Sequence, residues 1–228
     1  MDTATKTASA ALLEDEKILV EGYADLGRHH ATVVLPFVQS ILDLAGIRIE
    51  EIDLLAATGG PGSFTGLRIG AGTIKGLALA TGKPIVPVST LEALAMNAAG
   101  SGIPVCPLLD ARKGQVYGAL YRFDGTGLPQ AWIPDATVSL SELLGSIQEP
   151  ALFIGEGAVV YAEAIRERLG EKARFAPAPL NGIRASAVGW LAWHYYRAGR
   201  FADPLTFVPA YLRQSEAETK QPPPGQGT

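Results

Sequence analysis

Glycine is concentrated between residues 59 and 82, in the stretch GGPGSFTGLRIGAGTIKGLALATG. Glycine-rich turns that open a helix often cradle phosphate groups. A P-loop needs the spacing G-x-x-x-x-G-K-[ST], but here Lys75 is followed by Gly76. Gly70 and Gly72 match the first two glycines of the dinucleotide fingerprint G-x-G-x-x-G, but Lys75 occupies the position of the third glycine. Neither phosphate-binding pattern is complete, so these glycines need another explanation.

The glycines fall on two faces when residues 63–80 are read as a helix. Gly66 and Gly70 lie on one face, and Gly72 and Gly76 lie with Leu79 on another, roughly 100° or more away. An interior glycine costs a helix about 0.5–1 kcal/mol relative to alanine, so close packing must offset that cost. We expect two close neighbours, one inside the molecule and one that is a further helix or a partner. The alternative is that both faces are internal.

A second helix, predicted for residues 30–45, is apolar over roughly 200° of its circumference, which exceeds the stripe that a surface helix needs. The surplus is centred on Leu35, Val38 and Leu42; it faces a partner or is sandwiched within the core. Arg68 and Lys75 share one stripe of the glycine-rich helix, where they pair with a partner's acidic groups or line a solvated edge. The predicted partner interface comprises Leu35, Val38, Leu42, Arg68, Gly72, Lys75, Gly76 and Leu79.

Metal and nucleophile chemistry find little support in the sequence. His29 and His30 are adjacent, so on a helix they point about 100° apart and do not form the i, i+4 pair of a helical metal site. His194 lies in an aromatic helical stretch, and Cys106, the one cysteine, lies in a predicted strand. Ser63 lacks the G-x-S-x-G pattern and is interpreted as a helix N-cap. We expect no catalytic residue and no metal site.

Hydrophobic periodicity and turn residues predict the elements that position these residues. They are strands at 7–13 and 18–23, a helix at 30–45, a strand at 52–57, a helix at 63–80, a strand at 84–88 and a helix at 89–99 capped by Ser89 or Thr90. Beyond residue 102 a similar order follows, with strands at 103–109, 115–123 and 130–138, a helix at 139–147, a strand at 152–154 and helices at 158–169 and 185–198. This repeat predicts two related α/β domains, residues 1–102 and 103–218, and a disordered tail at 219–228.

The composition limits the class of protein. Of the 228 residues, 47% are hydrophobic and 18% charged, which predicts a packed core. The net charge of −4 argues against a chain that grips nucleic acid by itself. A single cysteine excludes a disulfide within the chain, and no apolar run approaches the ~20 residues of a membrane span. We expect a cytoplasmic protein with no membrane contact.

Five stretches of the chain carry a family resemblance: DTAT at 2–5, GPGSFTGLRIG at 60–70, STLEA at 89–93, DARKGQVY at 110–117 and PAYLR at 209–213. Together they resemble the bacterial TsaB (YeaZ) family, a branch of the TsaD/Gcp (peptidase M22-like) proteins. The resemblance runs from Asp2 to about residue 218. The family has a short apolar strand ahead of the position of Asp2, where this sequence has Met1, so we expect a shortened first strand.

The resemblance implies a fold and a function. The fold is that of the actin/sugar-kinase/Hsp70 (ASKHA, ribonuclease H-like) superfamily, with two duplicated domains and a cleft between them. In this family the protein is a non-catalytic scaffold that binds TsaD, and with TsaE they place threonylcarbamoyl on adenosine 37 of tRNA. Alone, such a protein forms a homodimer through the same surface. The tRNA is then contacted only through the complex, to which any ATP and magnesium also belong.

Two alternatives stay open. One is a stand-alone nucleotide-binding ATPase or kinase-like enzyme of the ASKHA fold; a more remote one is a metallopeptidase. By resemblance to ATP-binding members, a weak nucleotide site would lie at Asp2, Thr3, Asp110, Gly155 and Gly157. The first hairpin has no glycine and the second has one, so backbone amides approach phosphate poorly there. We therefore expect no cofactor bound by this chain alone.

Overall fold

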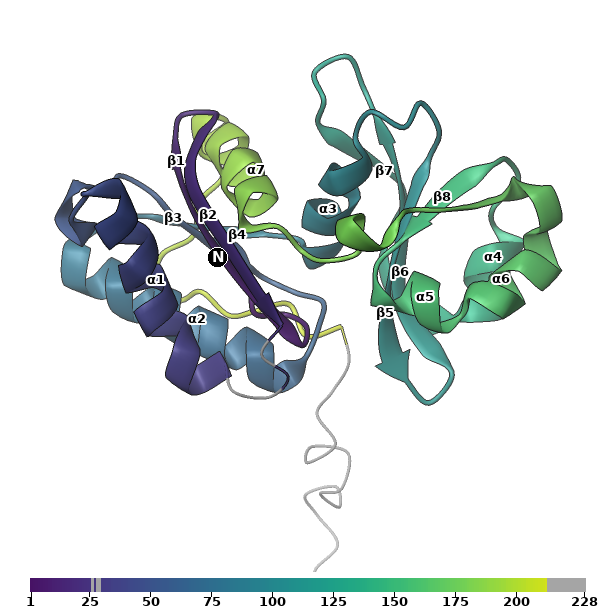
Figure 1. The fold of residues 1–228 in the computed structure, drawn as a ribbon, viewed down its shortest axis with the longest axis horizontal. Coiled ribbons are helices and arrows are strands. Elements are labelled where there is room, and N and C mark those ends of the chain that lie inside the picture. The colour runs from purple at the N-terminus through teal and green to yellow at the C-terminus, as the bar shows by residue number, and fades with distance from the viewer. Residues whose placement is uncertain (26, 28–29, 213–228) are drawn as a thin grey trace, which may run out of the picture.

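The computed structural model describes residues 1–25, 27 and 30–212, which form two lobes (Figure 1). In the first lobe, β1 (Thr7–Glu14) and β2 (Lys17–Asp25) form an antiparallel hairpin, and β3 (Leu55–Thr58) runs parallel to β4 (Ile85–Val88). Met1 and Asp2 lie between the two pairs. Asp2 pairs with Ser9 of β1, and the Thr58 amide donates to the Met1 carbonyl over 3.2 Å. The spatial order is therefore β2-β1-(residues 1–2)-β3-β4.

Helices cover both faces of this lobe. The helices α1 (His30–Ala45) and α2 (Phe64–Thr81) lie side by side on one face, and α7 (Ala185–Arg197) lies on the other (Figure 1). Ser63 caps α2, because its hydroxyl accepts from the Gly66 amide at 3.3 Å. Gly82 ends the helix in the left-handed region, with φ at 70°. The predicted cap and helix are confirmed.

The second lobe repeats the order of the first. Its sheet has the order β7-β6-β5-β8-β9, in which β6 is antiparallel to β5 and to β7, whereas β8 runs parallel to β5 and to β9. These strands are β5 (Val105–Arg112), β6 (Gln115–Phe123), β7 (Pro129–Ser139), β8 (Ala151–Ile154) and β9 (Ala173–Phe175). The helices α4 (Leu140–Gly145), α5 (Glu156–Val160) and α6 (Ala162–Leu169) lie beside it. The predicted α/β class, with one order used twice, is confirmed.

Two helices cross between the lobes. The helix α3 (Thr90–Ala95) precedes the second lobe in the chain but packs against β5 and β6. In contrast, α7 follows the second lobe in the chain and packs against β1, β3 and β4. The sequence division at residues 102 and 103 stays a prediction, and the packing assigns α3 to the second lobe and α7 to the first.

Some local expectations differ from the structure. The helix predicted at 158–169 is two helices, α5 and α6, which meet at Tyr161 with φ at −103°. The strand β9 has only three residues and gave no periodic signal. The predicted tail at 219–228 and His29 lie outside the described residues, as does the side chain of His30.

A C-terminal strap, residues 201–212, returns along the first lobe. The Ala202 amide donates to the Ile85 carbonyl and the Ala210 amide donates to the Gly59 carbonyl, each over 2.7 Å. Phe207 is 6% exposed and belongs to the core cluster that α1 and α2 share. The strap therefore fixes α2 from outside the sheet.

Candidate functional site

One glycine face of α2 is packed inside the molecule. A Cβ on Gly66 would lie 2.0 Å from the Thr3 carbonyl oxygen, and one on Gly70 would lie 2.5 Å from the Thr3 hydroxyl oxygen. Side-chain carbons do not approach this closely, so only glycine fits at these two positions. The prediction of an internal glycine face is confirmed for this pair.

The other glycine face is open. A Cβ built on Gly72 or Gly76 meets no atom of the described residues within 4 Å, and both glycines are exposed. Leu79 lies on the same side of α2 and is 57% exposed. Packing within the described chain therefore gives no reason for these two glycines.

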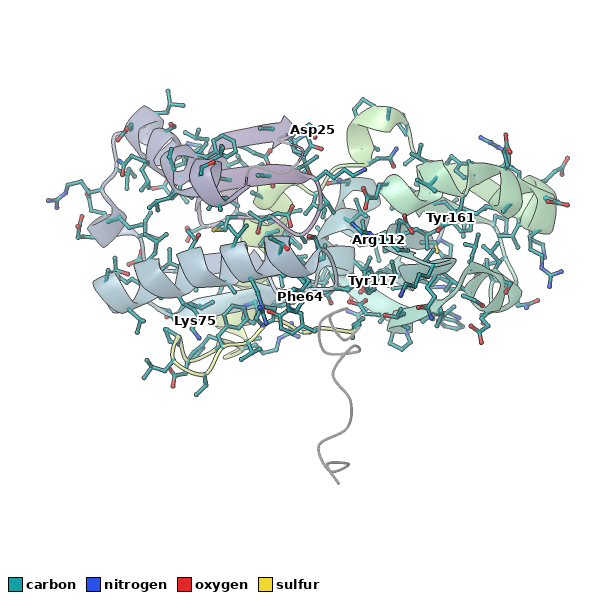
Figure 2. The ribbon with its side chains drawn as sticks, turned by 90° about the horizontal axis from the view of Figure 1, so that it is seen from below. Asp25, Phe64, Lys75, Arg112, Tyr117 and Tyr161 are labelled. Atoms are coloured by element: carbon teal, nitrogen blue, oxygen red, sulfur yellow. The ribbon has the colours of Figure 1, made fainter. Side chains whose placement is uncertain are left out.

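Arg68 and Lys75 have different surroundings, although both lie on α2. The Arg68 guanidinium stands 4.0 Å above the Phe64 ring, which itself lies 5.0 Å from the Tyr211 ring, and Arg68 stays exposed. Lys75 donates to the Phe207 carbonyl over 3.1 Å. Figure 2 shows Lys75 and Phe64 on α2. The Lys75 ammonium thus holds the strap of its own chain, and its contact with a partner stays a prediction.

On helix α1 the structure buries one residue of the predicted interface, Leu42. Leu42 is 6% exposed, so its side chain presents no free surface. Val38 is half-buried against the same core as Val34, and its contact with a partner stays a prediction. The physical reason for the burial of Leu42 is that α1 contacts the β1–β2 hairpin on one side and α2 on another, which buries a wide apolar arc. Leu35, at 53% exposure, remains outside.

We call the exposed members of the predicted interface the open helix face. It lies on the adjacent helices α1 and α2 and consists of Leu35, Arg68, Gly72, Gly76 and Leu79.

The residues considered for nucleotide binding near the N-terminus have structural partners. Asp2 and Thr3 are each 1% exposed. The Asp2 carboxylate accepts from the Thr58 hydroxyl at 2.7 Å, and the Thr3 hydroxyl donates to the Gly66 carbonyl at 2.8 Å. These contacts join the start of the chain to β3 and α2.

The second-lobe candidates are engaged in the same way. Asp110 accepts from the Tyr161 hydroxyl at 3.0 Å. A Cβ on Gly155 would lie 2.5 Å from the Leu108 carbonyl oxygen, and one on Gly157 would lie 2.9 Å from it, so both glycines allow α5 to approach β5. The sequence interpretation missed Tyr161, which no local pattern connects with Asp110.

The same region holds a carboxyl group that sequence reasoning did not single out. Burial raises the pKa of Glu156, and the negative charge of Asp110 adds to this, while the Lys6 ammonium opposes it. Glu156 lies between Gly155 and Gly157 in the sequence, and no local pattern marks it as a functional residue.

The described residues contain no group of three or more His, Cys, Asp or Glu side chains that could hold a metal ion. The His194 Nε2 atom lies 3.7 Å from a Glu16 carboxylate oxygen. Cys106 is fully buried in β5, and burial raises the pKa of its thiol far above the usual range, as expected for an inert strand cysteine. No helix of the described part is long and apolar enough to cross a membrane.

Two α/β lobes with one repeated strand order define a protein of the ASKHA type. A family model described as TsaD, tRNA N6-adenosine threonylcarbamoyltransferase, matches residues 24–221. The protein TsaB of Bacillus subtilis is 34% identical over 96% of this chain and 95% of its own, and that of Escherichia coli is 42% identical over 56% of each. The solved structure of YeaZ from Pseudomonas aeruginosa has a TM-score of 0.79 at 30% identity, covering 92% of this chain and 97% of that one. The chain belongs to the TsaB family of tRNA threonylcarbamoyladenosine biosynthesis proteins.

Proposed function

We propose that this chain is a non-catalytic scaffold that binds TsaD through the open helix face and thereby supports threonylcarbamoyl transfer to adenosine 37 of tRNA. Membership of the TsaB family supports the pathway. The observation that carries the partner role is the pair of exposed glycines, Gly72 and Gly76, in the interior of α2.

Energetics favour a protein partner at this face. Two interior glycines cost α2 about 1–2 kcal/mol relative to alanine, and no contact in the described chain offsets that loss. A second helix seated on bare backbone gains close packing there. Leu35 and Leu79 would lose water-exposed apolar surface, and Arg68 would stand at the rim, where a partner carboxylate can pair with it.

The assignment of the chemistry to the partner has separate support. Asp2, Thr3, Gly155 and Gly157 are used in contacts within the chain. The net charge of −4 disfavours tRNA phosphate, so the tRNA contacts belong to the complex with TsaD, together with TsaE, ATP and magnesium.

Calorimetric titration with TsaD of the same organism tests the surface. Gly72→Leu puts a side chain into open space, so the chain should fold while a docking helix is held off. We expect its Kd for TsaD to rise at least about 100-fold, and that of Leu79→Asp at least about 10-fold. The matched control is Gly145→Leu, at an exposed glycine of α4 whose Cβ also meets no described atom within 4 Å. Its Kd should stay within about twofold of the wild type.

A reconstituted tRNA assay with TsaD and TsaE gives the functional readout. Product formation should fall in the order of the measured affinities. If Gly72→Leu and Leu79→Asp fold and bind TsaD as tightly as the wild type, the proposed surface is wrong. ATP turnover by the purified chain alone that is lost in Asp110→Asn supports the stand-alone enzyme instead.

A further inference from the structure

The C-terminal strap runs beside the open helix face. Lys75 of α2 donates to the Leu205 carbonyl over 3.4 Å and to the Phe207 carbonyl over 3.1 Å. Lys75 follows Gly72 by three residues and precedes Leu79 by four, so the three are neighbours on one side of the helix. The strap therefore passes α2 at the level of the bare backbone. Figure 2 shows the strap along one side of α2 and α1 along the other.

The order of residues around α2 places the strap at the edge of the bare backbone. At about 100° per residue, Gly72 and Gly76 lie about 60° and 100° from Lys75 in one direction around the helix. In the opposite direction, the buried Ala71 lies about 40° from Lys75. The strap thus stands where the buried side of α2 ends and the open side begins.

The strap turns two large apolar side chains outward at this point. Phe207 enters the core, whereas Leu205 is 71% exposed and Val208 is 67% exposed. We call Leu205 and Val208 the strap wall. Because Lys75 and Leu79 are one helical turn apart, the exposed apolar surface of Leu79 continues onto the strap wall. A single exposed apolar side chain is ordinary on a protein surface, but a continuous group of them marks a contact surface.

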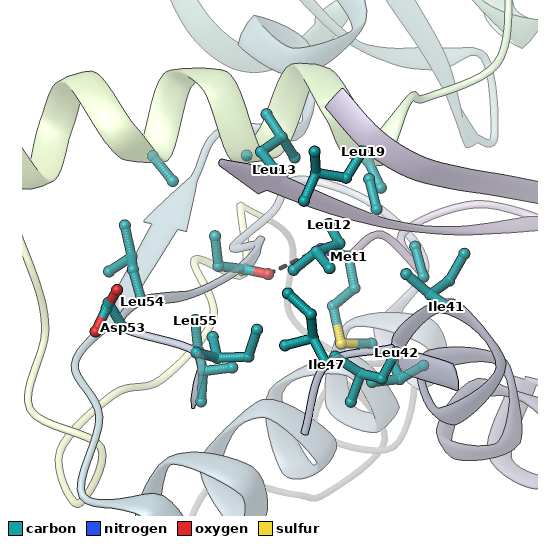
Figure 3. Close-up of a pocket in the computed structure, with 18 of the residues that line it drawn as sticks. Met1, Leu12, Leu13, Leu19, Ile41, Leu42, Ile47, Asp53, Leu54 and Leu55 are labelled. Carbon is teal, nitrogen blue, oxygen red and sulfur yellow. Dashed lines mark hydrogen bonds between the residues drawn. The ribbon is translucent and has the colours of Figure 1, made fainter. Parts of the chain in front are cut away.

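Helix α1, on the other side of α2, turns part of its apolar surface inward. Ile41 and Leu42 line a groove of about 350 Å³ between β1 and β3, where Met1 also lies (Figure 3). The Met1 nitrogen donates to the Ala56 carbonyl over 2.8 Å there. Helix α1 contributes only Leu35 to the open helix face, so the strap side offers a docked helix more exposed apolar surface.

A docked helix is wider than the bare backbone that receives it. An α-helix with its side chains is about 10–12 Å across. A helix seated on Gly72 and Gly76 approaches α2 closely, so its flanks reach the elements that lie beside α2. On one side that element is the strap wall, whose apolar surface is removed from water by the contact.

We propose that the strap wall is part of the TsaD docking surface, and that Leu205 and Val208 contact the flank of the TsaD helix seated on Gly72 and Gly76. This inference rests on the function proposed above and extends the open helix face onto a second, non-helical segment. It also specifies the partner: the TsaD helix carries apolar side chains on the flank that faces the strap as well as toward α2.

Calorimetric titration of strap variants with TsaD of the same organism tests this proposal. We expect the Kd for TsaD to rise at least about fivefold for Val208→Asp, and at least about 20-fold for the double variant with Leu205→Asp, because charge replaces apolar contact. The matched control is Val160→Asp, at a valine of α5 in the second lobe that is 62% exposed. Its Kd should stay within about twofold of the wild type.

Amide exchange in the unmodified protein gives a readout that needs no substitution. The Leu205 amide donates to the Asp203 carboxylate over 2.8 Å, and the Phe207 amide donates to the Asp203 carbonyl over 2.9 Å. Saturating TsaD should slow exchange in residues 204–208 at least about fivefold and leave exchange in α5 unchanged.

The outcomes separate this inference from the proposed function. Wild-type affinity of both strap variants, with a raised Kd for Gly72→Leu, would overturn the strap wall and leave the docking face in place. Wild-type affinity of all these variants would remove the docking face as well. If the strap variants lose only the self-association of the isolated chain and bind TsaD normally, a second copy occupies the strap wall, and the proposal is wrong.

Discussion

Gly66 and Gly72 show how one residue type serves two purposes on a single helix. At Gly66 the missing side chain admits the Thr3 backbone, whereas at Gly72 the space beside the helix is free of described atoms. Alanine at the two positions should therefore change stability in opposite directions.

Urea denaturation of Gly66→Ala and Gly72→Ala measures this contrast. Gly66→Ala forces a Cβ against a buried carbonyl oxygen and should lower the free energy of unfolding by about 1–3 kcal/mol or more. Gly72→Ala gains helix propensity in open space and should raise it by about 0.5–1 kcal/mol. Loss of stability in both variants would show that the second face is also closely packed in the isolated chain.

Met1 gives the protein a pH dependence near neutrality. Because its folded pKa is about 6 against 8.0 in the unfolded chain, the unfolded state binds more protons between these values. The free energy of unfolding should rise by up to about 2–3 kcal/mol from pH 6 to pH 8. Nα-acetylation keeps an N–H for Ala56 but removes the titration. Subtracting the acetylated protein's profile isolates this group, and identical profiles would contradict the prediction.

At the scale of elements, the C-terminal strap determines the surroundings of α2. A backbone carbonyl of the strap accepts a hydrogen bond from Lys75, and the Phe207 side chain enters the core cluster that α1 and α2 share. The Tyr211 ring packs on the Phe64 ring. The strap joins the core mainly through one aromatic side chain, because the Lys75 contact lies near the surface.

Two substitutions separate the contributions of Phe207 and Lys75 to the attachment of the strap. Phe207→Ala removes a side chain that is 6% exposed and should lower the free energy of unfolding by about 3–5 kcal/mol. Lys75→Met keeps the apolar stem of the side chain but removes its hydrogen bonds to the Leu205 and Phe207 carbonyls, and it should cost about 1 kcal/mol or less. Urea denaturation compares the two. Equal losses would mean that the ammonium anchors the strap as strongly as the aromatic ring does.

Local signals explain what the sequence predicted well. Residues 63–80 carry an N-cap, a regular apolar period and a terminal glycine, and α2 spans Phe64–Thr81. Non-local facts could not be predicted. The burial of Leu42 depends on a hairpin that covers α1. The carbonyls that accept hydrogen bonds from Lys75 lie 130 and 132 positions further along the chain. The contacts of α7 are made with the lobe that precedes it in the chain by more than a hundred residues.

At the scale of the whole molecule, the open helix face predicts self-association. In the absence of TsaD, we expect two copies to bury this face against each other, because the same bare backbone suits a second α2. Sedimentation velocity should show a dimer for the wild type and a monomer for Gly72→Leu. TsaD added to the wild type should convert the dimer into a heterodimer. A monomeric wild type at all concentrations would contradict this prediction.

The crossing of α3 and α7 between the lobes determines whether fragments of the protein can fold separately. A fragment ending at Gly102 would lack α7, which leaves one side of β1, β3 and β4 bare, and would keep α3 without the strands it covers. The complementary fragment would have the reverse defect. Neither fragment should fold when it is expressed alone. A protease cut at Ser101 in the intact protein should instead leave two fragments that stay associated until the protein is denatured.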